Sequence, residues 1–177
     1  MPRGRGPLTD DPSEPLDGFV TPITLPGDRT AVWLVAIGAW AVLVLAVLPP
    51  YLGPAGRSIL MQAFSFACHQ MPSRSPHIDG VPFAVCDRCL GLYAGIASGV
   101  LVGLFLAGTR RFVHRNAGFA IVAALIPVGS DWMFDIVGVW ANTPATRVST
   151  GGAFGLTMGV LLVAAAWPRR AMHRIAL

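Results

Sequence analysis

The sequence has few charged residues and no lysine. Only 12% of its 177 residues are charged, about half the fraction found in a soluble domain of this size, whereas 54% are hydrophobic. One small core cannot bury so many apolar side chains, so a lipid bilayer is the expected solvent and partner. The 13 basic residues, all arginine, exceed the acidic ones by a net charge of +4. They do not gather in one segment, which argues against a nucleic-acid partner.

Four apolar runs predict an all-α, polytopic membrane protein with four transmembrane helices. A helix needs about 20 apolar residues to cross the hydrocarbon core. The four runs cover residues 30–52, 90–108, 116–140 and 151–168. Between the first two, residues 57–71 have apolar positions at helical spacing but are too polar to span. This segment predicts a re-entrant or interfacial half helix.

The distribution of arginine predicts the orientation. Residues 1–28 are rich in proline, glycine and acid, a composition typical of a disordered tail, and residues 29–177 are expected to form a single membrane domain. Cytoplasmic loops carry an excess of arginine. The two tails and the hairpin with Arg111 and Arg115 carry most of the arginines and lie on one side of a four-span chain. Both termini are therefore expected in the cytoplasm, with residues 53–89 outside, in the inner (cytoplasmic) membrane of a bacterium.

The cysteines have a spacing typical of a metal site. Cys68 and His69 are adjacent, and Cys86 and Cys89 form a Cys-x-x-Cys segment. Three thiolates and one imidazole suit tetrahedral Zn²⁺, so the sequence predicts a zinc site at the extracytoplasmic surface. Adjacent side chains diverge by about 100° on a helix. The fourth ligand is therefore open between His69 and two alternatives, His77 and Asp131.

Three other interpretations of the chain remain open. Cys86 and Cys89, with Cys68 as a shuttle thiol, could form a membrane thiol–disulfide oxidoreductase, because a helix start and a neighbouring arginine lower thiol pKa values. A structural disulfide from Cys68 to Cys86 or Cys89 would attach the half-helix segment to the second span and leave one free thiol. A small transporter is the third possibility, and with four helices it would have to work as a homo-oligomer.

Polar residues in and after the third run are candidates for catalysis, although they indicate no reaction or substrate. Asp131 and Asp135 lie one helical turn apart in an apolar segment, where each carboxylate is costly. The two carboxylates would repel each other unless a cation lies between them. That cation could be Arg147, a metal ion or a substrate amine. The candidate catalytic residues are His69, Asp131, Asp135 and Arg147.

Glycines recur at every fourth position along the second and fourth runs. Small residues at this spacing let two helix backbones approach closely. Because both runs cross the membrane in the same direction, they could pack in parallel through these ridges, although the sequence does not give the partner that each ridge meets. The two ridges consist of Gly91, Gly95, Gly99 and Gly103, and of Gly151, Gly155 and Gly159.

Three strings resemble the signature of a family of small prokaryotic membrane proteins, domain of unknown function 2085. The strings are "CHQMPSRS", "VCDRCLGLYAG" and "NTPATRVSTGGAFG". The resemblance covers about residues 60–160 and implies a membrane protein, but no established activity. The residues that match the family pattern are Cys68, His69, Gln70, Arg74, Ser75, Cys86, Arg88, Cys89, Gly91, Tyr93, Gly95, Asn142, Arg147, Thr150 and Gly151.

Overall fold

The computed structural model describes residues 29–167, so the predicted disordered tail, residues 1–28, lies outside the described part of the chain. Six α-helices make up most of this part: α1 (Thr30–Val47), α2 (Pro54–Ser65), α3 (Asp87–Phe105), α4 (Ala107–Arg115), α5 (Ala117–Ile136) and α6 (Pro144–Ala166). Helices α1, α3, α5 and α6 are long and apolar enough to cross a membrane. The predicted all-α, four-span class is therefore confirmed.

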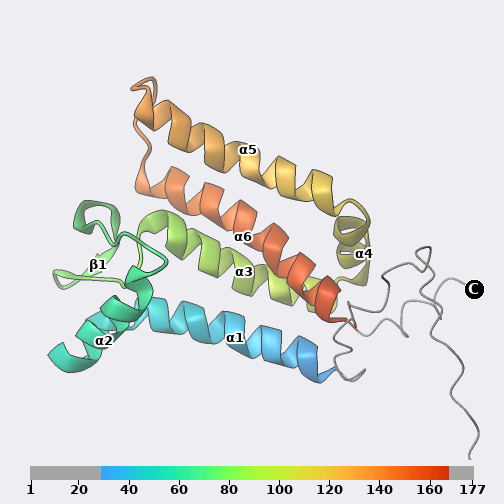
Figure 1. Ribbon diagram of the computed structural model, residues 1–177, viewed down its shortest axis with the longest axis horizontal. Coiled ribbons are helices and arrows are strands. Elements are labelled where there is room, and N and C mark those ends of the chain that lie inside the picture. Colours follow the sequence, from blue (N-terminus) through green and yellow to red (C-terminus); the bar gives the residue numbers. More distant parts are fainter. Residues whose placement is uncertain (1–28, 168–177) are drawn as a thin grey trace, which may run out of the picture.

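The four spanning helices lie side by side in the order α1, α3, α6, α5 (Figure 1). The most extensive packing is between α3 and α6, with α1 on the other side of α3 and α5 against α6. The start of α1 and the end of α6 lie at the same end of the bundle as α4 (Figure 1). Many large apolar side chains are exposed, among them Trp33, Ile37, Phe119 and Val122, as expected for helices surrounded by lipid.

Helices α3 and α6 approach closely because both glycine ridges lie in their interface. A Cβ atom at Gly95 would overlap the carbonyl oxygen of Gly152, and one at Gly99 would overlap that of Leu156. The contacting positions advance together along both helices, so the helices are parallel. Such short backbone approaches allow Cα–H groups to contact carbonyl oxygens across the interface. The predicted use of the glycine ridges for close helix packing is confirmed, and the structure shows that the two ridges pack against each other.

Two helix boundaries differ from the apolar runs. Helix α1 is shorter than its run because a pair of prolines forms the 3₁₀ turn Pro49–Tyr51. Helix α6 begins at Pro144, before the apolar run does. Its start is fixed by Thr143 and Thr146, each of which accepts the other's backbone N–H, at 3.2 and 3.0 Å. Arg147 therefore lies in the first turns of α6, although it precedes the fourth apolar run.

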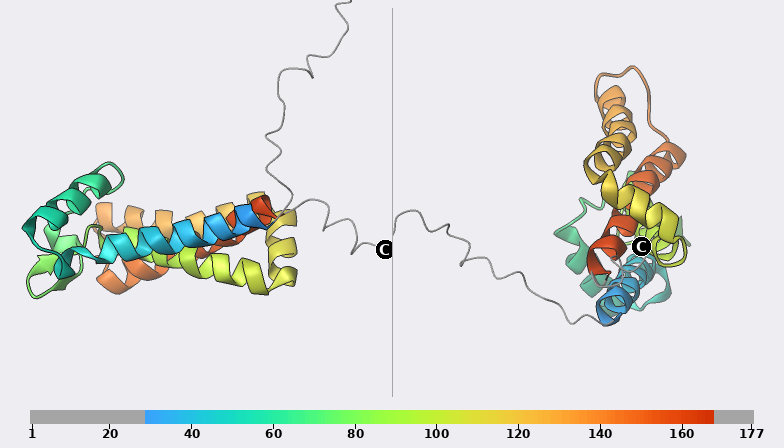
Figure 2. Two further views of the ribbon diagram at one scale, coloured as in Figure 1. Left: turned by 90° about the horizontal axis from the view of Figure 1, so that it is seen from below. Right: turned by 90° about the vertical axis from the view of Figure 1, so that its right-hand side faces the viewer.

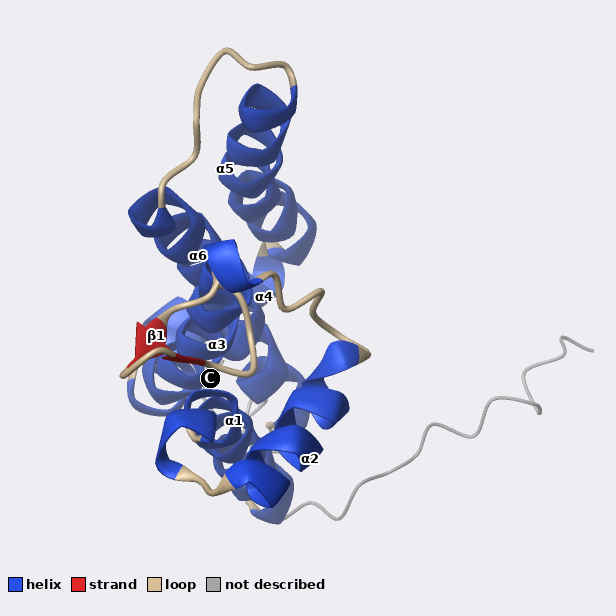
Figure 3. Cartoon of the chain, turned by 90° about the vertical axis from the view of Figure 1, so that its left-hand side faces the viewer, coloured by secondary structure: helices blue, strands red, loops and turns tan. Residues whose placement is uncertain are grey.

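The two ends of the bundle carry different short elements. Figure 2 shows α4 crossing the ends of the spanning helices, where the sequence predicted only a hairpin. At the opposite end (Figure 3), α2 corresponds to the predicted half helix and precedes a small β-hairpin. Strand β1 (His77–Ile78) pairs antiparallel with β2 (Val81–Pro82). The turn residues Asp79 and Gly80 have φ angles of 49° and 76°, as a two-residue Asp-Gly turn requires.

Candidate metal centre

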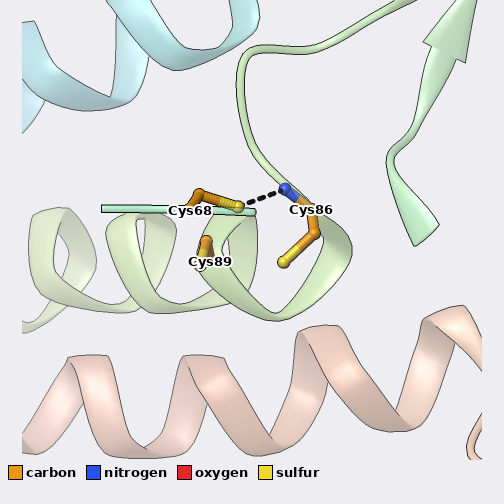
Figure 4. Close-up of side chains that lie close together, drawn as sticks. All are labelled: Cys68, Cys86 and Cys89. Carbon is orange, nitrogen blue, oxygen red and sulfur yellow. Dashed lines mark hydrogen bonds between the residues drawn. The ribbon is translucent and has the colours of Figure 1, made fainter. Parts of the chain in front are cut away.

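The side chains of all three cysteines converge at the start of α3 (Figure 4). The Sγ atoms of Cys68, Cys86 and Cys89 lie within 4.8 Å of one another, and all three cysteines are free thiols. Sulfur atoms bound to one zinc ion at about 2.3 Å lie about 3.8 Å apart, so only small movements separate this arrangement from a ligated one. The three cysteines could therefore hold a metal ion.

Hydrogen bonds from the loop bring Cys68 to the start of α3. The side-chain amide of Gln70 donates to the carbonyl oxygens of Met61, at 2.7 Å, and Ala84, at 2.8 Å. It thereby joins α2 to the segment that leads into α3. The backbone N–H of Ala84 in turn donates to the carbonyl oxygen of Ala46 in α1. Cys68 is buried in the apolar cluster that results. Gln70 matched a family motif, but the sequence alone gave it no role.

Hydrogen bonds from its neighbours make the Cys86 thiol more acidic than a free cysteine. Cys86 is the N-cap residue of α3, and its backbone N–H donates to Cys68 Sγ at 3.3 Å. The pKa of the Cys86 thiol is lowered to about 5, mainly by a hydrogen bond from the Cys89 side chain. Hydrogen bonds from the Cys68 side chain and from the backbone of Cys89 and Arg88 act in the same direction, while burial opposes them. A thiolate is the form that both metal binding and disulfide exchange require.

This low pKa predicts the pH dependence of alkylation. In metal-free protein at about pH 7, iodoacetamide should modify Cys86 before the other two cysteines, because a thiol is ionised above its pKa. The rate should stay nearly constant down to about pH 6 and fall below about pH 5, as the thiolate becomes protonated. Mass spectrometry of the labelled peptides gives the site and the rate. In detergent-denatured chain the rate should already fall below about pH 8.5, and the same fall in the folded protein would contradict the assignment.

The predicted nitrogen ligands do not lie with the sulfur atoms. Cys68 is buried while His69 is exposed, as the divergence of adjacent side chains predicts, and His77 is exposed on β1. Within residues 29–167, the three cysteines are the only group of three or more His, Cys or acidic side chains close enough to share one ion. Neither histidine nor Asp131 belongs to that group. A role for His69 as a ligand stays a prediction.

The two aspartates of α5 each pair with an arginine from another segment. Asp131 lies 2.5 Å from Arg88, which stands between the cysteines of the Cys-x-x-Cys segment. Asp135 lies 3.4 Å from Arg74, in the loop before β1. The sequence predicted one cation between the two carboxylates, supplied by Arg147, a metal ion or a substrate amine. The structure instead gives each carboxylate its own arginine, and the pairs hold α5 beside the cysteine cluster.

Arg147 joins the starts of α3 and α6. One guanidinium nitrogen lies 3.4 Å from Asp87, and the others donate to the side chain of Asn142, at 2.6 Å, and to its carbonyl oxygen, at 3.1 Å. The backbone N–H of Asn142 donates to Asp135 at 3.2 Å, which connects this group to α5. Asp87 was missed as a site residue. Its signal was its position in the first turn of a helix, where a carboxylate is favourable. A catalytic role for any of these side chains stays a prediction.

Comparison with known proteins identifies related sequences. Residues 68–161 match a family model described as predicted membrane protein (DUF2085), so the resemblance based on the motifs is confirmed. An uncharacterized protein of Methanocaldococcus jannaschii is 35% identical over 99 residues, which cover 56% of this chain and 63% of that relative. The match therefore spans less than two thirds of that relative's length. An uncharacterized protein of Methanothermobacter thermautotrophicus is 30% identical over 100 residues, covering 55% of this chain and 86% of the relative. No solved structure matches the chain.

These relatives correct one prediction. Both come from archaea, which contradicts the assignment of the protein to bacteria, whereas the broader prokaryotic resemblance fits them. The excess of arginine in cytoplasmic loops follows from membrane insertion and holds beyond one domain of life. The charge distribution therefore could not distinguish a bacterial from an archaeal protein. The orientation of the termini stays a prediction.

Proposed function

The chain belongs to the DUF2085 family of predicted membrane proteins, and from the geometry of its cysteines we propose that it binds one zinc ion at a membrane surface. Cys68, Cys86 and Cys89 supply three thiolate ligands. The observation that carries this proposal is the convergence of their Sγ atoms within 4.8 Å, from segments that are held together by hydrogen bonds not involving sulfur. The three cysteines meet because the loop is folded onto α3.

The surroundings favour an ion with an open coordination position. Three thiolates with Zn²⁺ carry a net charge of −1, which the positive end of the α3 dipole stabilises. Sites with three protein ligands commonly leave a fourth position for water or a substrate. Since no imidazole or carboxylate of residues 29–167 lies within the group, the fourth position of this site is open to a water molecule or a substrate.

Metal analysis of protein purified in detergent without chelator tests the proposal directly. We expect about one zinc ion per chain, together with three reactive thiols after denaturation and chelation. Copper in place of zinc would keep the three-thiolate site but change the ion, because soft thiolates also select Cu(I). Protein that contains no metal, and takes none up when zinc is added, would contradict the proposal.

A second candidate, a thiol–disulfide oxidoreductase, is favoured by the lowered pKa of Cys86. In that reaction two of the three thiols form a disulfide, and two electrons and two protons pass to an acceptor such as a membrane quinone. This candidate predicts that adding a quinone removes two thiols per chain and that chelator has no effect. The zinc proposal predicts the opposite on both measurements, because bound thiolates are protected until the metal is removed.

The proposed orientation places the cysteine cluster outside the cytoplasm. It rests on the arginines of α4 and of the two tails, which the rule for cytoplasmic loops assigns to the inner side. A reporter enzyme that folds only outside the cytoplasm should be active when inserted between β1 and β2 and inactive when inserted after Arg111. Activity at Arg111 would reverse the orientation. It would leave the geometry of the metal site untouched but move it to the cytoplasmic surface.

A further inference from the structure

The end of the bundle opposite the cysteines carries a short helix with two different faces. On the inner face of α4, Arg110 is buried, donates to the carbonyl oxygen of Gly103 at 3.0 Å, and lies 3.6 Å from the centre of the Trp167 ring. These contacts anchor α4 to the ends of α3 and α6. They also fix which side chains of α4 point away from the bundle.

The outer face of α4 presents a basic hollow. Arg111 and Arg115 are exposed and lie one helical turn apart. With Phe112 and Asn116 they line a hollow of about 420 Å³. Neither arginine forms an ion pair with any residue from 29 to 167. The sequence contains no Asp or Glu between Asp87 and Asp131, so no nearby carboxylate of this segment can neutralise them.

The position of this hollow indicates a membrane interface. Helix α4 crosses the ends of the spanning helices (Figure 2), and large apolar side chains are exposed on it and beside it, namely Phe105, Leu106, Phe112 and Phe119. A short helix with exposed arginines next to exposed aromatic and aliphatic side chains is typical of the headgroup region of a bilayer. There the arginines meet phosphate groups while the apolar side chains contact acyl chains.

We propose that the hollow on α4 binds the phosphate group of an anionic phospholipid. Two guanidinium groups one turn apart can donate several N–H groups to phosphate oxygens, a pairing that is stronger than a neutral hydrogen bond. The hollow is larger than one phosphate group and leaves room for the rest of a headgroup. Phe112 also lines the hollow and offers an apolar surface to the glycerol and the first acyl carbons. This lipid site is independent of the cysteine cluster at the other end.

Lipid binding to the full-length protein in detergent tests this site. Native mass spectrometry can follow titrations with phosphatidylglycerol, with phosphatidylcholine and with inorganic phosphate. We expect phosphatidylglycerol to bind more tightly than phosphatidylcholine, and added salt to weaken its binding. The double substitution Arg111→Gln and Arg115→Gln should weaken phosphatidylglycerol binding about tenfold or more. Each arginine near an anionic lipid strengthens binding severalfold, and the two effects multiply. The double substitution to Lys should keep most of the binding, because the charge remains.

A control with the same loss of charge is Arg29→Gln with Arg57→Gln, which leaves α4 intact. If this control loses phosphatidylglycerol as strongly as the α4 variant does, binding reflects net charge and the proposed site is wrong. If inorganic phosphate binds at the hollow and displaces phosphatidylglycerol at comparable concentration, the ligand is soluble phosphate and the lipid assignment is overturned. Unchanged binding in the α4 variant, with its helix content intact by circular dichroism, also overturns it.

Discussion

Alanine in place of Gly155 should lower the free energy of unfolding by about 3 kcal/mol, the upper part of the range for overpacked interiors. A Cβ atom at this position would overlap the carbonyl oxygen of Leu92 in α3. That obstacle is backbone and cannot rotate away, so the two helices must separate and lose contacts along their length. Thermal unfolding of purified protein in a single detergent measures the effect, and Gly95→Ala should behave in the same way.

Gly152 is a matched control on the same helix. The nearest atom to a Cβ at Gly152 is the carbonyl oxygen of Gly91, at 3.6 Å, which is an ordinary contact. Gly152→Ala should therefore leave the melting temperature unchanged or raise it slightly, because alanine favours helix more than glycine does. If Gly152→Ala and Gly155→Ala melt alike, helix propensity and not close packing determines the result, and the role assigned to the glycine ridges fails.

The α3–α6 interface is the part of the fold that the sequence predicts best. A spacing of four residues places small side chains on one stripe of a helix, whatever the rest of the protein does. Two such stripes, on helices that run in the same direction, can pack against each other. The start of α6 was harder to predict from the sequence, because hydropathy takes account only of apolar content. The signal was local and polar: Thr143 and Thr146 as reciprocal caps around Pro144.

The partners in the ion pairs of the site could not be predicted from the sequence. Asp131 and Asp135 could be identified as costly inside a membrane from their neighbours alone, and each does have a cationic partner. Which arginine pairs with which carboxylate depends on how α5 is placed against the loop and α3. Arg147 and Arg88 were equally available on the predicted outer side. Only the tertiary arrangement assigns Arg88 to Asp131 and leaves Arg147 for Asp87.

The convergence of the cysteines was predicted in part. The Cys-x-x-Cys segment places Cys86 and Cys89 near one another at a helix start through local geometry. Cys68 reaches them only through the loop that Gln70 holds to Ala84, a contact with no local signal. His69 was predicted as a ligand because it is adjacent to Cys68 in the sequence. In the structure the chain turns at Gln70, whose φ angle is 49°, with Cys68 buried and His69 exposed.

Serine in place of any one cysteine should strongly weaken zinc binding if all three thiolates hold one ion. A hydroxyl group stays protonated near neutral pH and is a poor ligand for Zn²⁺ compared with a thiolate. Cys68→Ser, Cys86→Ser and Cys89→Ser should each weaken zinc binding by about a hundredfold or more. They should lower the melting temperature by similar amounts, because metal binding is coupled to stability. Chelator should reproduce this loss in the natural sequence and have little effect on the variants.

Two further substitutions separate the ligands from their neighbours. Asp131→Asn removes the carboxylate that pairs with Arg88 and should lower stability without loss of zinc, because Asp131 is not among the grouped ligand atoms. His69→Gln should leave both zinc and stability nearly unchanged, since the imidazole is exposed. If His69→Gln loses zinc as the cysteine variants do, the loop closes further when metal binds and the Cys₃His set predicted from sequence is correct. Cysteine variants with unequal stabilities and no response to chelator would instead favour disulfide exchange, in which an attacking thiolate and its partner have different roles.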